Sequence, residues 1–179
     1  MRSRARRTGS AGTGPTASPT ATTTLPEPAL AALQATLAGE HAAVWAYGTL
    51  GPRAGRAGED LARSMLVAHA TSRDGLRALL VGAGAIPEAA EAAYALPVDP
   101  TEPVTAAEVA ALVEERLAAV YADLVAATSR RDLRTIAIAG VTTAAVGLAR
   151  WRGSAPPFPG LPERAGTGPT GPPTSAPSE

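Results

Sequence analysis

The chain has 179 residues, which is room for one domain of ordinary size, and its 16 arginines balance its 16 acidic residues. It contains no cysteine, which excludes disulfides, thiolate metal sites and cysteine nucleophiles. Residues 26–152 hold 11 Arg against 9 Glu and 5 Asp, so this region carries a net charge of −3. A weakly acidic body argues against a nucleic-acid-binding surface.

Residues 1–24 form an Arg-, Ser-, Thr- and Pro-rich segment that we expect to be a disordered tail. Arg6 and Arg7 resemble a twin-arginine signal, but no apolar segment follows them, so secretion is not supported. We also find no apolar run long enough to span a membrane. We therefore expect a cytoplasmic protein.

A first helix is predicted from the capping-box pattern at residues 24–27 to about Leu50. One face of this helix should be buried because its residues recur three and four apart. They are Leu30, Leu33, Leu37, Glu40, Val44 and Tyr47. Burying the Glu40 carboxylate costs several kcal/mol unless a cation, a metal or a proton compensates its charge. The chain must therefore supply a partner for Glu40.

A second helix is predicted to begin at Gly58, with acids in its first turn, and to end near Gly82. One of its stripes combines apolar and basic residues: Leu66, His69, Arg73, Leu76 and Leu80. His69 and Arg73 are thus the first candidates to compensate Glu40. His41, the neighbour of Glu40, points about 100° away on its helix, so we expect it on the helix surface or between helices.

A third helix is predicted to begin at the capping box of residues 105–108, and a fourth at residues 129–132, running to about Trp151. Short connections make the first and second helices, and the third and fourth, antiparallel pairs. Residues 85–104 form a proline-containing linker that can reach roughly 60 Å. A 24-residue helix is only about 36 Å long. The linker therefore predicts a crossover that makes the second and third helices parallel. Trp45 and Trp151 should then lie near one end.

This topology brings three potential metal ligands to one level of the bundle. Counted from the shared end, Glu40, His69 and Glu114 fall within about 5 Å of each other along the bundle axis. Glu114 shares a helical face with Leu117 and Tyr121, although the sequence leaves open whether Glu114 or Glu115 faces the core. We interpret Tyr47 and Tyr121 themselves as core packing.

Residues 154–179 are proline-rich and should form a second disordered tail. This leaves residues 25–153 as the folded domain.

Residues 30–152 resemble the actinobacterial ferritin-like domain family of unknown function. The resemblance is carried by AGEHAAVWAYG at residues 38–48, HATSRD at residues 69–74 and EERLAAVYADL at residues 114–124. It continues through ARWR at residues 149–152 and FPGLP at residues 158–162. The resemblance implies an all-α, ferritin-like four-helix bundle with a long crossover, and no established activity.

Ferritin-like di-iron proteins use one Glu on each of two helices and a Glu-x-x-His on each of the other two. Glu40, His69 and Glu114 (or Glu115) match part of that set, but Leu66 replaces one Glu. The fourth helix contains neither Glu nor His. We therefore expect no conventional di-iron centre. We expect a buried ion network of Glu40, His69 and Arg73 instead, and the alternative is iron or another divalent ion bound by Glu40, His69 and Glu114.

These residues leave two functions open. The first is a non-catalytic binding or scaffolding module with a degenerate metal site, and the alternative is a metal-binding protein with oxidoreductase or metal-handling activity. An apolar helix face also suggests a homodimer. No Ser/His/Asp arrangement and no glycine-rich loop after a strand supports hydrolase, transferase or nucleotide chemistry, so we assign no catalytic residue.

Overall fold

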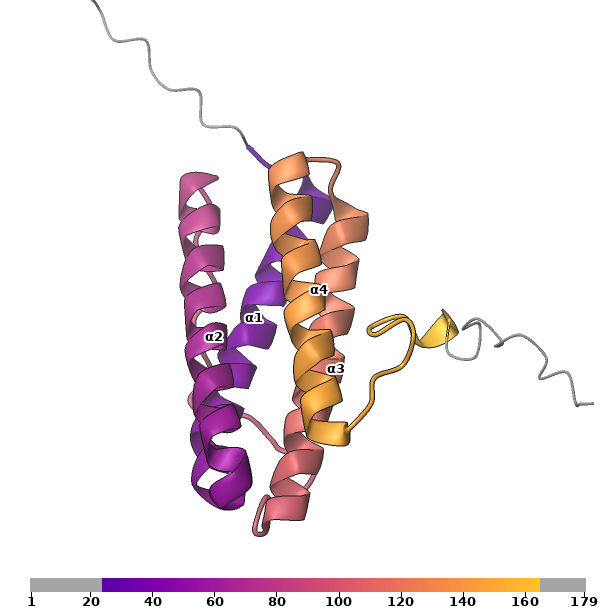
Figure 1. The fold of residues 1–179 in the computed structure, drawn as a ribbon. Helices are drawn as coiled ribbons and strands as arrows, with labels where there is room; N and C mark the ends of the chain where they lie inside the picture. Colours follow the sequence, from indigo (N-terminus) through magenta and orange to yellow (C-terminus); the bar gives the residue numbers. More distant parts are fainter. Residues whose placement is uncertain (1–23, 165–179) are drawn as a thin grey trace, which may run out of the picture.

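The structure is a computed structural model that describes residues 24–164 (Figure 1). Within these residues it contains four α-helices and two short 3₁₀ turns, and no strand. The elements are α1 (Glu27–Leu50), η1 (Gly51–Arg53), α2 (Gly55–Gly82), α3 (Pro103–Ala127), α4 (Arg131–Arg152) and η2 (Pro162–Arg164). Residues 1–23 of the first predicted tail (residues 1–24) and residues 165–179 of the second lie outside the described residues.

The four helices run in the directions that the linker length predicts. α1 and α4 run one way and α2 and α3 the other, so the segment after α2 returns along the bundle before α3 begins (Figure 1). The indole Nε1–H of Trp151, at the end of α4, donates to the Tyr47 hydroxyl at 2.9 Å. Trp45 lies two residues before Tyr47, so both tryptophans lie near the same end, as predicted.

The crossover between α2 and α3 is tied to the outer side of α1. The Gln34 amide donates to the Ile86 carbonyl at 2.8 Å and accepts from the Glu88 N–H at 3.0 Å. His41 Nε2 donates to the Glu88 carbonyl at 3.3 Å and is buried beneath this segment. The His41 side chain therefore lies between helix and crossover rather than between two helices.

The helix starts differ from the predicted capping boxes. α1 begins at Glu27 without any side-chain cap from Thr24. α3 begins at Pro103 with Glu102 as its N-cap, three residues before the predicted N-cap Thr105. The Thr105 hydroxyl accepts from the Glu102 N–H at 3.1 Å, and the Glu102 side chain caps the third helical amide in return. Proline suits the first helical position because its missing N–H has no partner there in any case.

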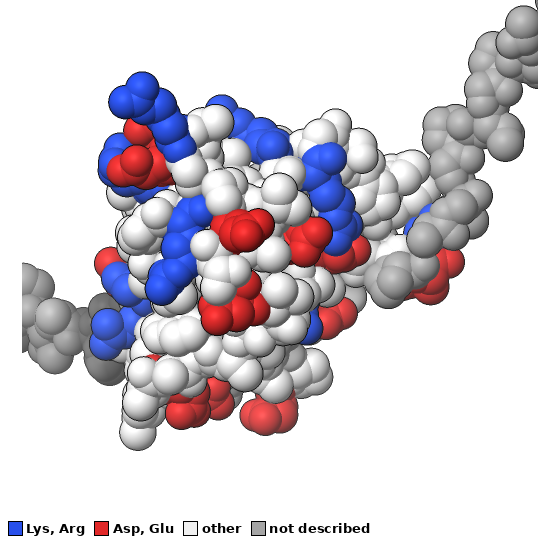
Figure 2. Space-filling model, turned by 90° about the horizontal axis from the view of Figure 1, so that it is seen from below, with Lys and Arg blue, Asp and Glu red and all other residues white. Residues whose placement is uncertain are grey.

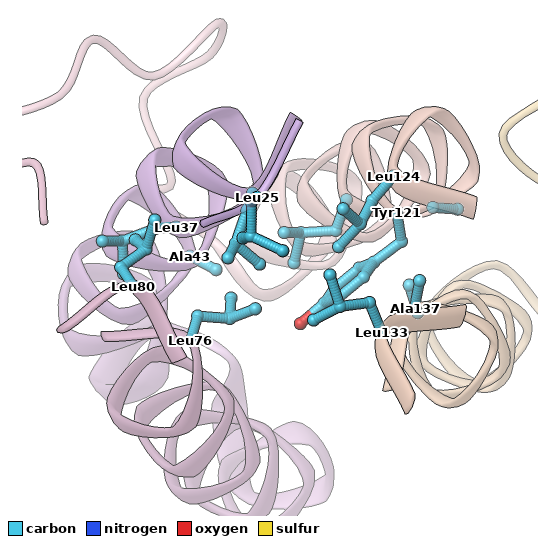
Figure 3. Close-up of a cluster of buried hydrophobic side chains, with 13 residues drawn as sticks. Leu25, Leu37, Ala43, Leu76, Leu80, Tyr121, Leu124, Leu133 and Ala137 are labelled. Carbon is cyan, nitrogen blue, oxygen red and sulfur yellow. The ribbon is translucent and has the colours of Figure 1, made fainter. Parts of the chain in front are cut away.

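Two apolar clusters fill the bundle, one toward each end. The larger cluster contains leucines of all four helices, including Leu37, Leu76, Leu124 and Leu133 (Figure 3). The second cluster lies toward the end where α1 finishes and contains Leu50, Met65 and Val109, among others. Each fully buried side chain of this kind contributes about 1.5–3 kcal/mol. Between the clusters lies the layer that holds Glu40.

Part of the predicted C-terminal tail packs on the bundle. Gly160 has a φ of +80°, and a Cβ built on it would lie 2.5 Å from the backbone carbonyl of Ala118 in α3. Pro159 and Leu161 line a shallow cavity with Ile138 and other residues of α3 and α4. The described residues after α4, up to residue 164, thus form a strap over α3 and α4, beyond residue 153, where we expected the folded domain to end.

α4 is the most apolar helix on its outer side. Among the described helices it is the one that is long and apolar enough to cross a membrane by length and composition alone, and 28% of its most apolar stretch is buried in the bundle. Its exposed apolar side chains are Ile136, Ile138 and Val146. In the structure α4 packs antiparallel to α3.

Charged side chains of both signs are interspersed over the end of the bundle seen in Figure 2. That face carries no large single-sign patch of the kind that attracts a polyanion.

Candidate polar network in the bundle core

Five polar side chains meet in the layer between the two apolar clusters. Glu40 and Tyr47 come from α1, His69 from α2, and Glu114 and Tyr121 from α3. All five are buried, and none is more than 3% exposed. The structure therefore brings together the three residues that were predicted to share one layer, and it adds two tyrosines.

His69 bridges the two carboxylates. Its Nδ1 lies 2.9 Å from Glu40 Oε2, and its Nε2 lies 3.0 Å from Glu114 Oε1. Ionised carboxylates only accept hydrogen bonds, so both ring nitrogens donate and the ring is an imidazolium. Burial alone would lower the pKa of His69, but the bonds to Glu114 and Glu40 outweigh it and raise that pKa to about 9.

Each of the two tyrosine hydroxyls donates a hydrogen bond to one of the carboxylates. The Tyr47 hydroxyl donates to Glu114 Oε1 and the Tyr121 hydroxyl donates to Glu40 Oε1, each at 2.5 Å. Burial, together with the neighbouring carboxylate, raises the pKa of both phenols, so both stay protonated. The Tyr47 ring also stacks on the His69 ring, with centroids 5.3 Å apart.

The tyrosines and glutamates follow the same spacing on two helices. In α1 Tyr47 comes seven residues after Glu40, and in α3 Tyr121 comes seven residues after Glu114. α1 and α3 run in opposite directions, so each tyrosine reaches the glutamate of the other helix (Figure 1). The interpretation of these tyrosines as core packing alone therefore missed their hydrogen bonds. The repeated Glu-x₆-Tyr spacing is the signal that could have identified them.

α4 contributes no polar side chain to this layer, and two of its glycines face the network. A Cβ on Gly147 would lie 2.7 Å from Glu114 Cδ, and a Cβ on Gly140 would overlap the Tyr121 ring. At either position the added Cβ would lie closer to its neighbour than Cβ atoms lie in real structures. These glycines, also seven residues apart, leave the room in which the glutamate and tyrosine side chains lie.

The predicted place of Arg73 in the network is corrected by the structure. Its guanidinium pairs with Asp74 at 2.9 Å, at the surface, while both oxygens of Glu40 are bonded to His69 and Tyr121. A guanidinium on a long flexible stem stays hydrated at little cost, so the shorter His69 takes the buried position.

The structure also distinguishes Glu114 from Glu115. The Glu114 side chain is fully buried, whereas Glu115 is partly exposed and pairs with Arg152 of α4 at 3.0 Å. Glu114 is thus the glutamate of α3 that belongs to the core.

Comparison with known proteins places the chain in a family. The sequence profile of the family described as "Domain of unknown function (DUF4439)" matches residues 32–163. The chain belongs to this family. It is also similar to a solved structure, that of a conserved hypothetical protein, rv2844, from Mycobacterium tuberculosis. The two chains share 29% sequence identity over 70% of this chain and 88% of the other, with a TM-score of 0.68. No match was found among curated proteins.

The family match includes every residue of the network and most of the strap after α4. It does not assign a reaction, so the chemistry of this DUF4439 domain has to be argued from its own side chains. Two buried glutamate side chains face the one ring of His69 in this layer. Among the described residues, Glu114 Oε2 is the buried side-chain oxygen that has no hydrogen-bond partner.

A di-iron centre does not fit these residues. Both nitrogens of His69 are used in bonds to the glutamates, and α4 presents glycine where a ligand would be needed.

Proposed function

We propose that this DUF4439 domain is a non-catalytic, ferritin-like four-helix bundle that acts as a binding or scaffolding module. The observation that supports the proposal is the imidazolium of His69, bonded through both nitrogens to Glu40 and Glu114. It supplies the positive charge that a metal would supply in a ferritin-like di-iron protein. Its burial also keeps bulk solvent and substrates away from the carboxylates.

The role of such a network is to fix one arrangement of the helices. Each Tyr-to-Glu bond joins α1 to α3, and His69 joins both of them to α2. Because an unpaired buried charge costs several kcal/mol, a rotated or shifted helix would be penalised. The bundle therefore presents a rigid outer surface, which is what a binding or scaffolding module requires.

Unfolding with and without a chelator tests this proposal. Protein purified without chelators should melt at the same temperature in EDTA as in buffer, because no metal contributes to its stability. A melting temperature that falls by several degrees in EDTA would contradict the proposal, since a ligand that binds the folded state stabilises it by mass action.

The alternative function is a metal-binding protein, and the unpaired Glu114 Oε2 favours it. Glu40, His69 and Glu114 would hold one iron or another divalent ion after His69 lost a proton. Such an ion would supply redox chemistry or metal handling. Elemental analysis of the same preparation distinguishes the two functions: the alternative requires about one ion per chain that Glu114→Gln abolishes.

A cytoplasmic location and a homodimer, both expected from the sequence, remain predictions. Ultracentrifugation of the full chain over a range of concentrations would test the second.

A further inference from the structure

An apolar cavity of about 150 Å³ lies between α1, α3 and the crossover. It is separate from the polar network, because its walls come from the sides of α1 and α3 that face the crossover. Its lining includes Gly39, Ala42, Ala46, Leu96, Val113 and Arg116. We call it the crossover pocket.

The crossover pocket exists because small side chains on α1 leave space under a fixed cover. Gly39, Ala42 and Ala46 have little or no side chain to fill it. Residues 94–97 cover it, and the Tyr94 ring contacts the Trp45 ring, with centroids 6.0 Å apart. The Tyr94 hydroxyl also accepts from the Glu91 N–H at 3.0 Å. The cover is therefore held in place, and the cavity is preformed.

One cation lies at the edge of this cavity. Arg116 lines the pocket and is exposed to solvent. Among residues 24–164 it forms no ion pair, whereas its neighbour Glu115 is already paired with Arg152. A guanidinium beside an apolar cavity matches a ligand that has an apolar body and a carboxylate, which arginine can bind with two parallel hydrogen bonds.

The volume limits the size of the apolar body. A cavity of about 150 Å³ with apolar walls holds a guest the size of benzene. We infer that the crossover pocket binds a small apolar carboxylate, with a benzene-sized body between α1 and α3 and its carboxylate on Arg116. This inference deepens the binding role proposed above and rests on it, but it uses none of the residues of the polar network.

Calorimetric titration of the full chain with benzoate tests the inference, with benzyl alcohol as a neutral ligand of similar shape. We expect saturable binding of benzoate that is at least about tenfold tighter than that of benzyl alcohol. Arg116→Gln should remove this preference, and Arg116→Glu should make benzylamine the better ligand. Arg56→Gln, an exposed charge change at the start of α2, should leave benzoate binding unchanged. Ala42→Leu, which fills the cavity, should abolish binding of both ligands.

Several results would overturn the inference. One is the absence of saturable benzoate binding at tens of millimolar, and another is benzoate binding that survives Ala42→Leu. Equal binding of benzoate by wild type and Arg116→Gln would remove the role of the cation. Arg116 is exposed, so its variants should fold, and circular dichroism checks this. The chelator and melting experiments do not involve this pocket, so a failure here would leave the proposed role of the network standing.

Discussion

At the scale of single residues, His69 decides how two buried carboxylates are tolerated. Glu40 and Glu114 would repel each other in a low-dielectric interior, and one imidazolium between them offsets most of that cost. The Tyr121 hydroxyl then binds the oxygen of Glu40 that His69 does not reach, and the Tyr47 hydroxyl shares Glu114 Oε1 with His69. The hydrogen bonds thus run in one chain from Tyr47 through Glu114, His69 and Glu40 to Tyr121, and removing one of these side chains leaves its neighbours without a partner.

Removing one partner from this chain should be costly. Glu40→Gln leaves the imidazolium of His69 with less compensation, and we expect it to lower the free energy of unfolding by about 3 kcal/mol. Glu40→Leu combined with His69→Leu should not recover that loss, because it leaves the buried Glu114 carboxylate without a cation. Urea denaturation measures both effects.

Arg73→Leu is the matched control for that comparison. Arg73 lies one turn after His69 on α2, and its substitution removes only the surface ion pair with Asp74. Because exposed ion pairs contribute little, the free energy of unfolding should change by less than about 1 kcal/mol. A cost for Arg73→Leu as large as that for Glu40→Gln would contradict the bonding that we assign to Glu40.

The raised pKa of His69 makes stability depend on pH. The folded pKa of about 9 lies above the value of about 6.5 expected in the unfolded chain. The stabilisation is therefore complete below about pH 6.5 and is lost as the pH rises toward 9, by roughly 3 kcal/mol in total. Urea denaturation between about pH 6 and 9.5 measures this loss. His69→Gln should flatten the profile, and a wild-type profile that is already flat would refute the assignment.

At the scale of the elements, α4 supports the network by having no side chain at two positions. Gly147→Ala should destabilise the fold by about 1–3 kcal/mol, because its Cβ would overlap the Glu114 carboxyl group. Helix propensity alone would predict the opposite sign. Gly75→Ala is the matched control, since a Cβ there in α2 meets no other atom within 4 Å. It should stabilise the protein by about 0.5–1 kcal/mol in the same denaturation experiment.

At the scale of the whole molecule, the crossover and the strap cover the bundle from two sides. The crossover is bonded to α1, while the strap touches α3 at Gly160. The crossover thus adds contacts to α1, and the strap adds contacts to α3, beyond those between the helices themselves. The crossover also closes the crossover pocket.

Gly160→Ala should release the strap. Its Cβ would clash with the backbone of Ala118, and a φ of +80° adds strain for any residue with a Cβ. We expect faster amide hydrogen exchange in residues 154–164. Gly153→Ala has the same φ but no close neighbour, so it should cost only the strain and leave the exchange of residues 158–164 unchanged. Equal exchange in both variants would mean that the contact with Ala118 does not hold the strap.

Local patterns in the sequence determined the helices, their order and the burial of Glu40. Apolar residues three and four apart identify a helix face whatever surrounds it, and the length of the linker limits how the two helix pairs can connect. The helix starts were less predictable, as at Glu102, because several nearby polar side chains can cap the same amides.

Only the tertiary structure decided which groups compensate Glu40. Arg73 and His69 lie one turn apart on the same face of α2, and a small rotation of that helix changes which of them reaches the interior. The crossed bonds from Tyr47 and Tyr121 require α1 and α3 to be antiparallel at close range, and Gly147 matters only because Glu114 faces it. These pairings depend on distances between helices that no spacing within one helix encodes, because they are fixed when the bundle packs as a whole.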